Sequence, residues 1–331
     1  MKQKVFASVG WLLTATATVL VMGHLAQAQS VNAPSGNGAG NSLKISPTRN
    51  DPTIERGESE DVMVSIQNVS DQKITLHPIF NDFVAGGENG EANLVLDEDQ
   101  YAPTHSLKRF MQEMGDVTLQ PRETKQVPIT INVPESAQPG GYFGAVRFVP
   151  AKGTEGQVAV SGSVSSLILL KVPGDYVESM QLKEFNVLQD GKAKSRLTSG
   201  KNVTALVRLE NKGGVQVEPF GAVFVTKNGK QVYSAKINDI TPAGSILPDS
   251  VRRWEVPLEK MDSFGKYTVT MTVGYGAGGD TLTQERTIWV IPTLYIIMGL
   301  AALALVVVIV VAVVVGLKSY KKKILKSTRR R

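Results

Sequence analysis

An uncharged run of 25 residues near the C-terminus constrains this chain more than any other feature. Residues Thr293–Leu317 contain 22 apolar side chains and no Lys, Arg, Asp, Glu or His. As an α-helix this run is about 37 Å long, which exceeds the roughly 30 Å hydrocarbon core of a bilayer. A buried helix of a soluble protein rarely stays uncharged over such a length. We therefore expect one transmembrane helix over residues 293–317.

The residues that flank this run predict its interface with water and its direction. Trp289 and Tyr295 stand where amphipathic aromatic rings lie at a membrane surface. Lys318 opens the tail, residues 318–331, in which all eight charged side chains are Lys or Arg. Short basic flanks stay in the cytoplasm. The expected protein is a single-pass protein of the cell membrane with an extracellular ectodomain and a short cytoplasmic tail.

The N-terminus has the layout of an export signal. Two lysines precede a long apolar run that ends in Ala26-Gln-Ala28, a small-x-small cleavage pattern. Residues 1–28 are predicted to be a signal peptide cleaved after Ala28, and an uncleaved anchor is the alternative. Residues 29–42 are rich in Ser, Asn, Gly and Pro and are expected to form a disordered spacer.

The distribution of charge follows this topology and does not indicate a nucleic-acid-binding protein. The net charge is +6. Residues 1–28 carry two Lys and no acid, and residues 293–331 carry eight basic side chains and no acid, so residues 29–292 have a net charge of −4. A mildly acidic ectodomain offers no basic footprint for nucleic acid. The chain also has no Cys, which fits a bacterial surface protein better than a eukaryotic ectodomain held by disulfides.

Alternation with a period of two predicts β-strands through most of the ectodomain. Apolar residues occupy every second position in residues 62–66 and 127–133, which is typical of strands with one buried face. Pro128 falls on the outer side, as in an edge strand. The predicted fold is all-β, with two tandem immunoglobulin-like β-sandwiches, residues 43–174 and 175–291, and one C-terminal transmembrane helix.

A glycine and tyrosine pattern occurs once in each half of the ectodomain. Gly140-Gly-Tyr142 and Gly265-Lys-Tyr267 each stand immediately before a late strand. In a tyrosine corner the tyrosine hydroxyl bonds back to the backbone a few residues upstream, and the glycine permits the corner. We expect one such structural corner in each sandwich.

An insertion over residues 83–116 distinguishes the first half from the second. Within it, Ser106 and Gly115 are a plausible N-cap and C-terminal residue of a short helix. Four apolar side chains of this segment follow helical spacing: Leu107, Phe110, Met111 and Met114. They form either part of the core or an exposed groove for a partner. Because loops on rigid sandwiches often carry binding, the insertion is the candidate interaction site.

The chain lacks the usual residues of catalysis. His77 and His105 are the histidines that follow the signal peptide, and there is no Cys to act as a nucleophile or zinc ligand. The acidic stretch Asp97–Asp99 lacks the ligand spacing of an EF-hand loop. No glycine-rich segment opens a helix in the manner of a phosphate loop. We expect no catalytic residues, no metal and no cofactor, hence no enzyme.

Several short motifs carry a resemblance to a known family. They are Leu43-Lys-Ile-Ser-Pro47, Thr124–Pro134 and Pro139–Gly144. Over most of residues 43–291 the chain resembles the WxL-interacting proteins of Gram-positive-type bacteria, which have a signal peptide, two β-sandwich domains, one membrane helix and a basic tail. The resemblance implies that the first domain binds peptidoglycan and that the second binds a partner or host protein.

These observations favour a membrane-anchored bacterial cell-surface binding or scaffold protein. Its sandwiches would engage cell-wall glycan, such as peptidoglycan, or another surface protein. The alternative is an assembly factor, or chaperone-like protein, that pairs an edge strand with components of surface structures. A hydrolase of wall polymers would need a pair of carboxylates, and the sequence singles out no such pair.

Overall fold

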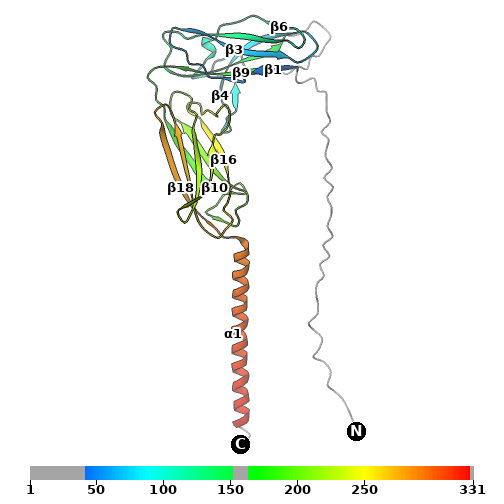
Figure 1. Ribbon diagram of the computed structural model, residues 1–331, viewed down its shortest axis with the longest axis vertical. Coiled ribbons are helices and arrows are strands. Elements are labelled where there is room, and N and C mark those ends of the chain that lie inside the picture. Colours follow the sequence, from blue (N-terminus) through cyan, green and yellow to red (C-terminus); the bar gives the residue numbers. More distant parts are fainter. Residues whose placement is uncertain (1–41, 152–162, 329–331) are drawn as a thin grey trace. The chain divides into compact units, whose positions relative to one another are not determined.

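The computed structural model describes residues 42–151 and 163–328. The predicted signal peptide, with its cleavage pattern at Ala26 and Ala28, lies outside the described residues, as does the predicted spacer except for Ser42. The described chain consists of β-strands followed by one long helix (Figure 1). The predicted all-β fold with two immunoglobulin-like sandwiches and a C-terminal apolar helix is confirmed.

The first sandwich is built from two sheets among the described residues. One sheet has the strand order β1-β3-β7, and the other has the order β2-β9-β8-β4-β5, with β6 also paired to β4. All of these pairs are antiparallel except β2 with β9. The strand bounds are β1 Leu43–Ser46, β2 Arg49–Asn50, β3 Ser59–Asn68, β4 Ile74–Ala85, β5 Ala92–Leu94, β6 Val117–Leu119, β7 Thr124–Asn132, β8 Gly140–Pro150 and β9 Val164–Val172.

The alternation seen in the sequence directs one face of each strand into this core. In β3, Val62, Val64 and Ile66 are buried, whereas Met63 between them is 47% exposed. Burial of such side chains contributes about 1.5–3 kcal/mol each and dominates sandwich stability. In β7, Pro128 is exposed, and β7 lies at the edge of its sheet. A proline at this position leaves no ladder hydrogen bond unmade.

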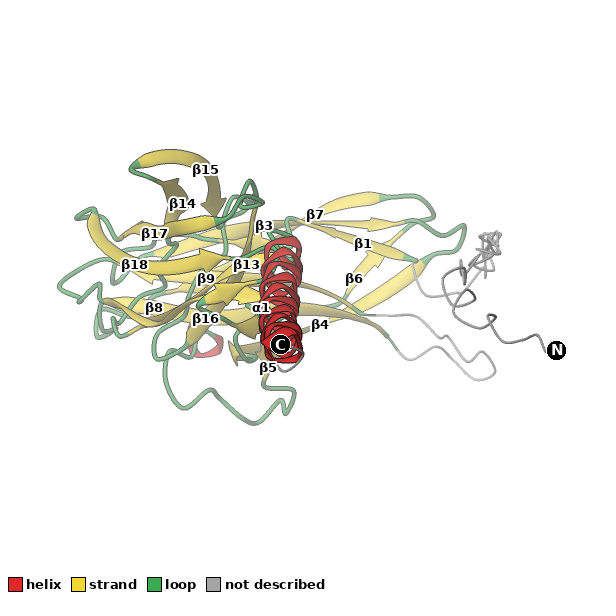
Figure 2. Ribbon diagram, turned by 90° about the horizontal axis from the view of Figure 1, so that it is seen from below, coloured by secondary structure: helices red, strands yellow, loops and turns green. Residues whose placement is uncertain are grey.

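The second sandwich repeats the two-sheet plan (Figure 2). Its sheets have the orders β11-β10-β13-β16 and β12-β18-β17-β14-β15. A separate cluster of buried side chains, including Phe185, Val207 and Tyr267, fills its core. The strand bounds are β10 Met180–Gln189, β11 Lys192–Ala193, β12 Arg196–Leu197, β13 Val203–Asn211, β14 Phe220–Lys227, β15 Lys230–Ile237, β16 Val251–Leu258, β17 Gly265–Tyr275 and β18 Asp280–Val290.

Each tyrosine of the Gly-x-Tyr pattern bonds back to the backbone four residues upstream. The hydroxyl of Tyr142 donates to the carbonyl oxygen of Gln138 at 2.9 Å, and that of Tyr267 donates to the carbonyl oxygen of Ser263 at 3.0 Å. The glycine two residues before each tyrosine has a φ of +139° or +144°, which side chains with a Cβ rarely adopt. This is the geometry of a tyrosine corner.

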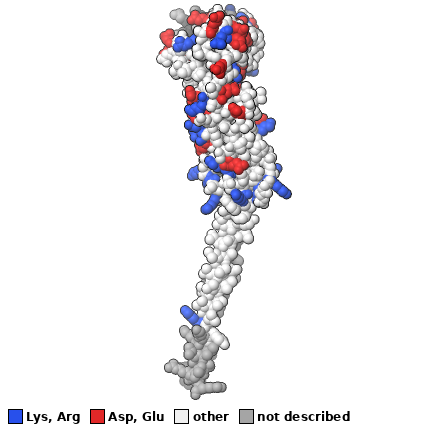
Figure 3. All heavy atoms as spheres, turned by 90° about the vertical axis from the view of Figure 1, so that its left-hand side faces the viewer, with Lys and Arg blue, Asp and Glu red and all other residues white. Residues whose placement is uncertain are grey.

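Helix α1, Thr293–Thr328, contains the whole predicted span and continues into the predicted tail, so that Lys318 lies within it. The apolar side chains from Leu294 to Leu317 are exposed rather than covered by protein. The helix is long and apolar enough to cross a membrane. Figure 3 shows it free of charged side chains over most of its length, in contrast to the sandwiches.

The buried tyrosine corner predicts unequal losses when each tyrosine is replaced by phenylalanine. Tyr267 is 1% exposed, so Tyr267→Phe should lower the free energy of unfolding by about 1 kcal/mol, because a partly buried hydrogen bond to the carbonyl oxygen of Ser263 is lost. Tyr142→Phe is the matched control, since its bond is exposed and water replaces the lost partner. Thermal unfolding followed by circular dichroism compares them. Equal losses would contradict a stabilising role for the second corner.

Candidate functional site

The predicted insertion, residues 83–116, does not form a single unit. Strand β4 continues through Ala85, turns, and returns as β5, with Phe83 opposite Leu94 and Ala85 opposite Ala92. The rest of the insertion crosses the first sandwich as a loop with one short helical turn. The first part contacts the second sandwich, whereas the second part packs on the first sandwich. We call them the β4–β5 hairpin (residues 83–94) and the covering loop (residues 95–116).

The tip of the β4–β5 hairpin contacts the second sandwich through Glu88. Its carboxylate accepts two hydrogen bonds from the guanidinium of Arg208, on β13, one of them at 2.7 Å. Its carbonyl oxygen accepts a hydrogen bond of 2.8 Å from the backbone N–H of Arg253, on β16. Arg208 also donates to Glu184, on β10, at 2.9 Å. One arginine therefore joins carboxylates from both sandwiches in a bidentate geometry that favours guanidinium.

The charges of this network shift the pKa values of its three side chains. Hydrogen bonds from Arg208 hold the pKa of Glu88 and that of Glu184 below the usual range. The same carboxylates raise the pKa of Arg208. All three side chains are about one-third exposed, so solvent screens the pair and its contribution is of the order of 1 kcal/mol or less.

Two consecutive buried residues of β4 organise the covering loop. Asn81 and Asp82 are fully buried. The Asn81 amide donates to the carbonyl oxygen of Val95 at 2.8 Å. The two carboxylate oxygens of Asp82 accept from the backbone N–H groups of Ala102, at 2.9 Å, and Lys108, at 2.8 Å. Buried polar groups hold a segment in place when their partners are in the segment itself. The loop is thus fixed at three points.

The predicted α-helix over residues 106–115 is wrong. The structure has only a 3-10 turn, η1, Lys108–Phe110, without a side-chain N-cap from Ser106. The backbone is used elsewhere, because the N–H of Lys108 is bonded to Asp82 and the N–H of Gln112 donates to the carbonyl oxygen of Thr130 at 3.0 Å. These tertiary bonds replace the helical ladder, and Gly115 ends no helix.

The four apolar side chains of this segment belong to the core of the first sandwich. Leu107 is fully buried, and Met111 is 9% exposed. Phe110 and Met114 are partly buried and pack against the same cluster. Of the two alternatives, core or exposed partner groove, the structure places them in the core. The covering loop therefore offers a partner its outer residues rather than this stripe.

An exposed aromatic and cationic patch remains on the outside of the covering loop. Tyr101 is 45% exposed. The guanidinium carbon of Arg109 lies 4.2 Å from the centre of its ring, and the Lys108 ammonium lies 5.0 Å from it. Lys108 is held in turn by the carbonyl oxygens of Glu98 and Gln100. Such a rigid aromatic ring beside a cation suits contact with a sugar face or a carboxylate.

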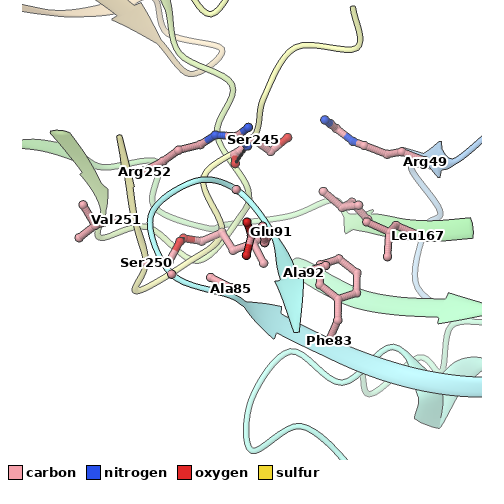
Figure 4. Close-up of a pocket in the computed structure, with 14 residues that line it drawn as sticks. Arg49, Phe83, Ala85, Glu91, Ala92, Leu167, Ser245, Ser250, Val251 and Arg252 are labelled. Carbon is pink, nitrogen blue, oxygen red and sulfur yellow. Dashed lines mark hydrogen bonds between the residues drawn. The ribbon is translucent and has the colours of Figure 1, made fainter. Parts of the chain in front are cut away.

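A pocket lies beside the β4–β5 hairpin, with an empty volume of about 490 Å³ that includes its open mouth. Phe83 and Leu167 of the first sandwich line its floor, and Ser245 of the second sandwich lies on its wall. Figure 4 shows the guanidinium groups of Arg49 and Arg252 pointing toward each other from opposite sides. An apolar floor with convergent guanidinium groups suits a small anionic group.

The two arginines of the pocket differ in their partners. Arg49 pairs with Asp51 and Glu218. Arg252 donates to the carbonyl oxygen of Ser245 at 2.8 Å, and no carboxylate in the described part of the chain lies within ion-pair distance of it. Burial, together with the nearby charge of Arg49, lowers the pKa of Arg252. Burial also raises the pKa of Asp51 against the effect of its arginine.

The histidines and acidic stretch of the sequence occupy separate places. Nδ1 of His77 lies 2.8 Å from the carboxylate of Asp116 at the surface, and Nδ1 of His105 lies 2.6 Å from the carbonyl oxygen of Gly141. Over residues 42–151 and 163–328, no three His, Asp or Glu side chains come together as a metal site.

A comparison with protein families finds a match within the first sandwich. Residues 51–149 match the family model described as WxL Interacting Protein, peptidoglycan binding domain. Over these residues the first sandwich is similar to that peptidoglycan-binding domain family. The resemblance predicted from the short motifs is confirmed for this domain, which contains the β4–β5 hairpin and the covering loop.

Comparisons of structure and sequence add the following. The structure is similar to the class 5 fimbriae chaperone CfaA, with 15% identity, 74% of this chain and 98% of that chain covered, and a TM-score of 0.39. The Pseudomonas aeruginosa chaperone CupB2 has 11% identity, with 73% of this chain and 99% of that chain covered and a TM-score of 0.31. The E. coli chaperone DraB has 16% identity, with 76% of this chain and 98% of that chain covered and a TM-score of 0.31. These scores are too low to carry a functional argument. A sequence comparison with curated proteins finds no match.

The edge strand β7 of the first sandwich is poorly suited to pairing with another chain. Pro128 interrupts its exposed edge. The covering loop pairs with the same strand, since Met111 bridges Ile131 and Gln112 donates to Thr130. A proline and a covering segment are two ways in which proteins block an edge. The alternative function as an assembly factor gains no support from this strand.

Gly90 sets the position of Arg252, which predicts a difference between two glycine substitutions in the β4–β5 hairpin. Gly90 and Gly87 both have positive φ, +82° and +88°. A Cβ on Gly90 would lie 2.2 Å from the guanidinium carbon of Arg252, whereas a Cβ on Gly87 would meet nothing within 4 Å. Gly90→Ala should therefore cost about 1 kcal/mol more stability than Gly87→Ala, because Arg252 loses its charged hydrogen bond.

Urea unfolding of the full chain in detergent measures this difference. In an Arg252→Ala background the two alanine substitutions should cost the same, as in a double-mutant cycle. A difference that persists without the Arg252 side chain would show that Gly90 acts through something other than this contact.

The lowered pKa of Glu88 predicts that its contribution depends on pH. An undocked glutamate titrates near 4.3, and the docked group titrates lower. The stabilisation is therefore complete above about pH 4.3 and is lost as the pH falls through the lowered pKa. The gap in melting temperature between the wild type and Glu88→Gln should be present at pH 7 and vanish toward pH 3. Glu113→Gln, at an exposed position of the same insertion, should show no such gap at either pH.

Proposed function

We propose that this protein is a membrane-anchored bacterial cell-surface protein whose first sandwich binds peptidoglycan of the cell wall. The observation that carries the proposal is the match of residues 51–149 to a peptidoglycan-binding domain. Helix α1 supports the anchor, because it is long and apolar enough to span a bilayer. The proposed topology has the sandwiches outside the cell and the C-terminal end of α1 inside.

The covering loop supplies the proposed contact surface. Tyr101 presents an exposed ring, on which a sugar can stack, and Arg109 presents a guanidinium that can pair with a carboxylate of a wall peptide. Asn81 and Asp82 hold the loop rigidly, and a preorganised loop loses less conformational entropy on binding. Binding without catalysis agrees with the family type of this domain.

A binding assay with insoluble peptidoglycan tests the proposal. Full-length protein in detergent is mixed with purified sacculi, and the fraction that sediments is measured against sacculus concentration. The wild type should sediment with the sacculi. Tyr101→Ala and Arg109→Gln should weaken binding roughly tenfold or more, as expected for anchors at the centre of a contact.

Arg56→Gln provides the matched control, because Arg56 is an exposed arginine of the same sandwich outside the covering loop. It should bind like the wild type. A wild-type protein that stays in the supernatant at every sacculus concentration would contradict peptidoglycan binding. Full binding by both loop variants would place the contact on another surface of the first sandwich.

A further inference from the structure

The two ends of the second sandwich carry opposite charge. At one end, Gln189 lies opposite Val203, Val203 lies opposite Leu258, and Gly265 lies opposite Val290. The loops that connect the strands at this end are therefore neighbours. They are residues 190–202, 227–230 and 259–266, and we call them the basal loops. Since β18 ends here and α1 begins at Thr293, the helix leaves the sandwich at the same end.

The basal loops are basic although the ectodomain as a whole is acidic. They contain eight Lys and Arg against three Asp and Glu. The segments at the opposite end, residues 174–180, 211–219, 238–250 and 276–280, contain one Lys against six Asp and Glu. Figure 3 shows Lys and Arg gathered at the end of the ectodomain from which the helix leaves.

Most of the basal cations are directed to solvent. Exposed side chains of this set are Lys192, Arg196, Lys201, Lys230, Lys260 and Lys266. None of these six takes part in an ion pair among the described residues. Lys227 differs, because it donates to Ser263 and to the carbonyl oxygen of Phe264 and so holds a basal loop together. The exposed cations remain available to an external anion.

Exposed aromatic rings accompany these cations. Phe264, from a basal loop, lies 6.4 Å from Trp289, on β18, and 5.5 Å from Tyr295, in the first turn of α1. All three rings are exposed by 44–52%. Sheet register places Trp289 between Lys266 on one side and Arg196 on the other, and residues directly opposite share a face. Aromatic rings between cations are typical of the membrane interface.

We propose that the basal loops, with Phe264, Trp289 and Tyr295, form a surface that contacts the membrane and binds anionic lipid headgroups. The inference rests on the proposed membrane span of α1 and adds a second contact with the same bilayer. The cations face phosphate groups, and the rings enter the headgroup layer. This contact restrains the second sandwich against the membrane, so that α1 does not act as a free tether. Each Lys near an anionic surface strengthens such a contact about fivefold.

Full-length protein in lipid nanodiscs tests the proposal. One set of nanodiscs contains phosphatidylcholine alone. In the other set about 30% of the lipid is phosphatidylglycerol, an anionic lipid of the kind that attracts polybasic segments. Amide hydrogen exchange is measured for the basal loops and for the opposite end. Anionic lipid should slow exchange in the basal loops by roughly fivefold or more and leave the opposite end unchanged. High salt should reverse the effect, because it screens exposed charges.

Two triple variants separate local from overall charge. Lys201, Lys230 and Lys260 are changed together to Gln, and the matched control changes Lys44, Lys73 and Lys125, three exposed lysines of the first sandwich. The first variant should lose the lipid effect, and the control should keep it. The inference would be overturned if the basal loops of the wild type exchanged their amide hydrogens equally fast in both lipids. It would also be overturned if both triple variants lost the effect of anionic lipid to the same extent.

The same experiment distinguishes this inference from the proposed function. Protein that fails to enter nanodiscs would contradict the membrane span of α1 itself. Protein that enters them but shows no dependence on anionic lipid contradicts only the basal contact. Quenching of Trp289 fluorescence by brominated lipid in a background with Trp11→Phe and Trp254→Phe gives a second readout, and the absence of quenching would show that the ring stays in water.

Discussion

The apolar side chains of α1 have no protein surface on which to be buried in the described chain. Exposed to water, each would cost about 25 cal/mol for every Å² of apolar area, and the proposed span in a bilayer, which the length and composition of the helix allow, removes this cost. The proposed span places the end of β18, and with it the base of the second sandwich, near a membrane surface. The separation of charge in that sandwich and the aromatic rings around Trp289 agree with this proposed placement.

Above the helix, two sandwiches without cysteine depend on their cores and on a few buried polar groups. Asn68 ends β3 and Asn211 ends β13, and both are fully buried. In each case the amide donates to the carbonyl oxygen four residues ahead, Gln72 or Val215, and the side-chain oxygen accepts from the backbone N–H two residues ahead. The same side chain therefore closes the same turn in both sandwiches. A satisfied buried amide specifies this turn, whereas an apolar residue would leave the turn carbonyl unpaired.

The sequence predicted what depends on local pattern and missed what depends on distant partners. Alternation in residues 62–66 places a strand on a core face by periodicity alone, and the Gly-x-Tyr patterns mark corners. The helical spacing of residues 106–115 was misleading, because the carboxylate of Asp82 and the backbone of β7 capture N–H groups that a helix needs. The burial of Asp82 in β4 was the physical cause, and a charged residue within an apolar strand was the available signal. The contact of Glu88 with Arg208 joins residues 120 positions apart, and no periodicity encodes it.

The insertion of the first sandwich and the ends of the second divide the contacts of the ectodomain between different partners. The β4–β5 hairpin reaches Arg208, and Arg49 reaches Glu218 at the acidic end of the second sandwich. Arginines thus join the two sandwiches through carboxylates that are partly exposed, and such pairs specify orientation more than they add stability. The covering loop leaves Tyr101 partly exposed beside Arg109 for the proposed wall contact, and its own backbone is held by Asn81 and Asp82. In the proposed arrangement the second sandwich is a spacer. Its acidic end meets the first sandwich through Glu218 and Arg49, and its basic end meets the proposed membrane surface, which accounts for the cations gathered beside the helix.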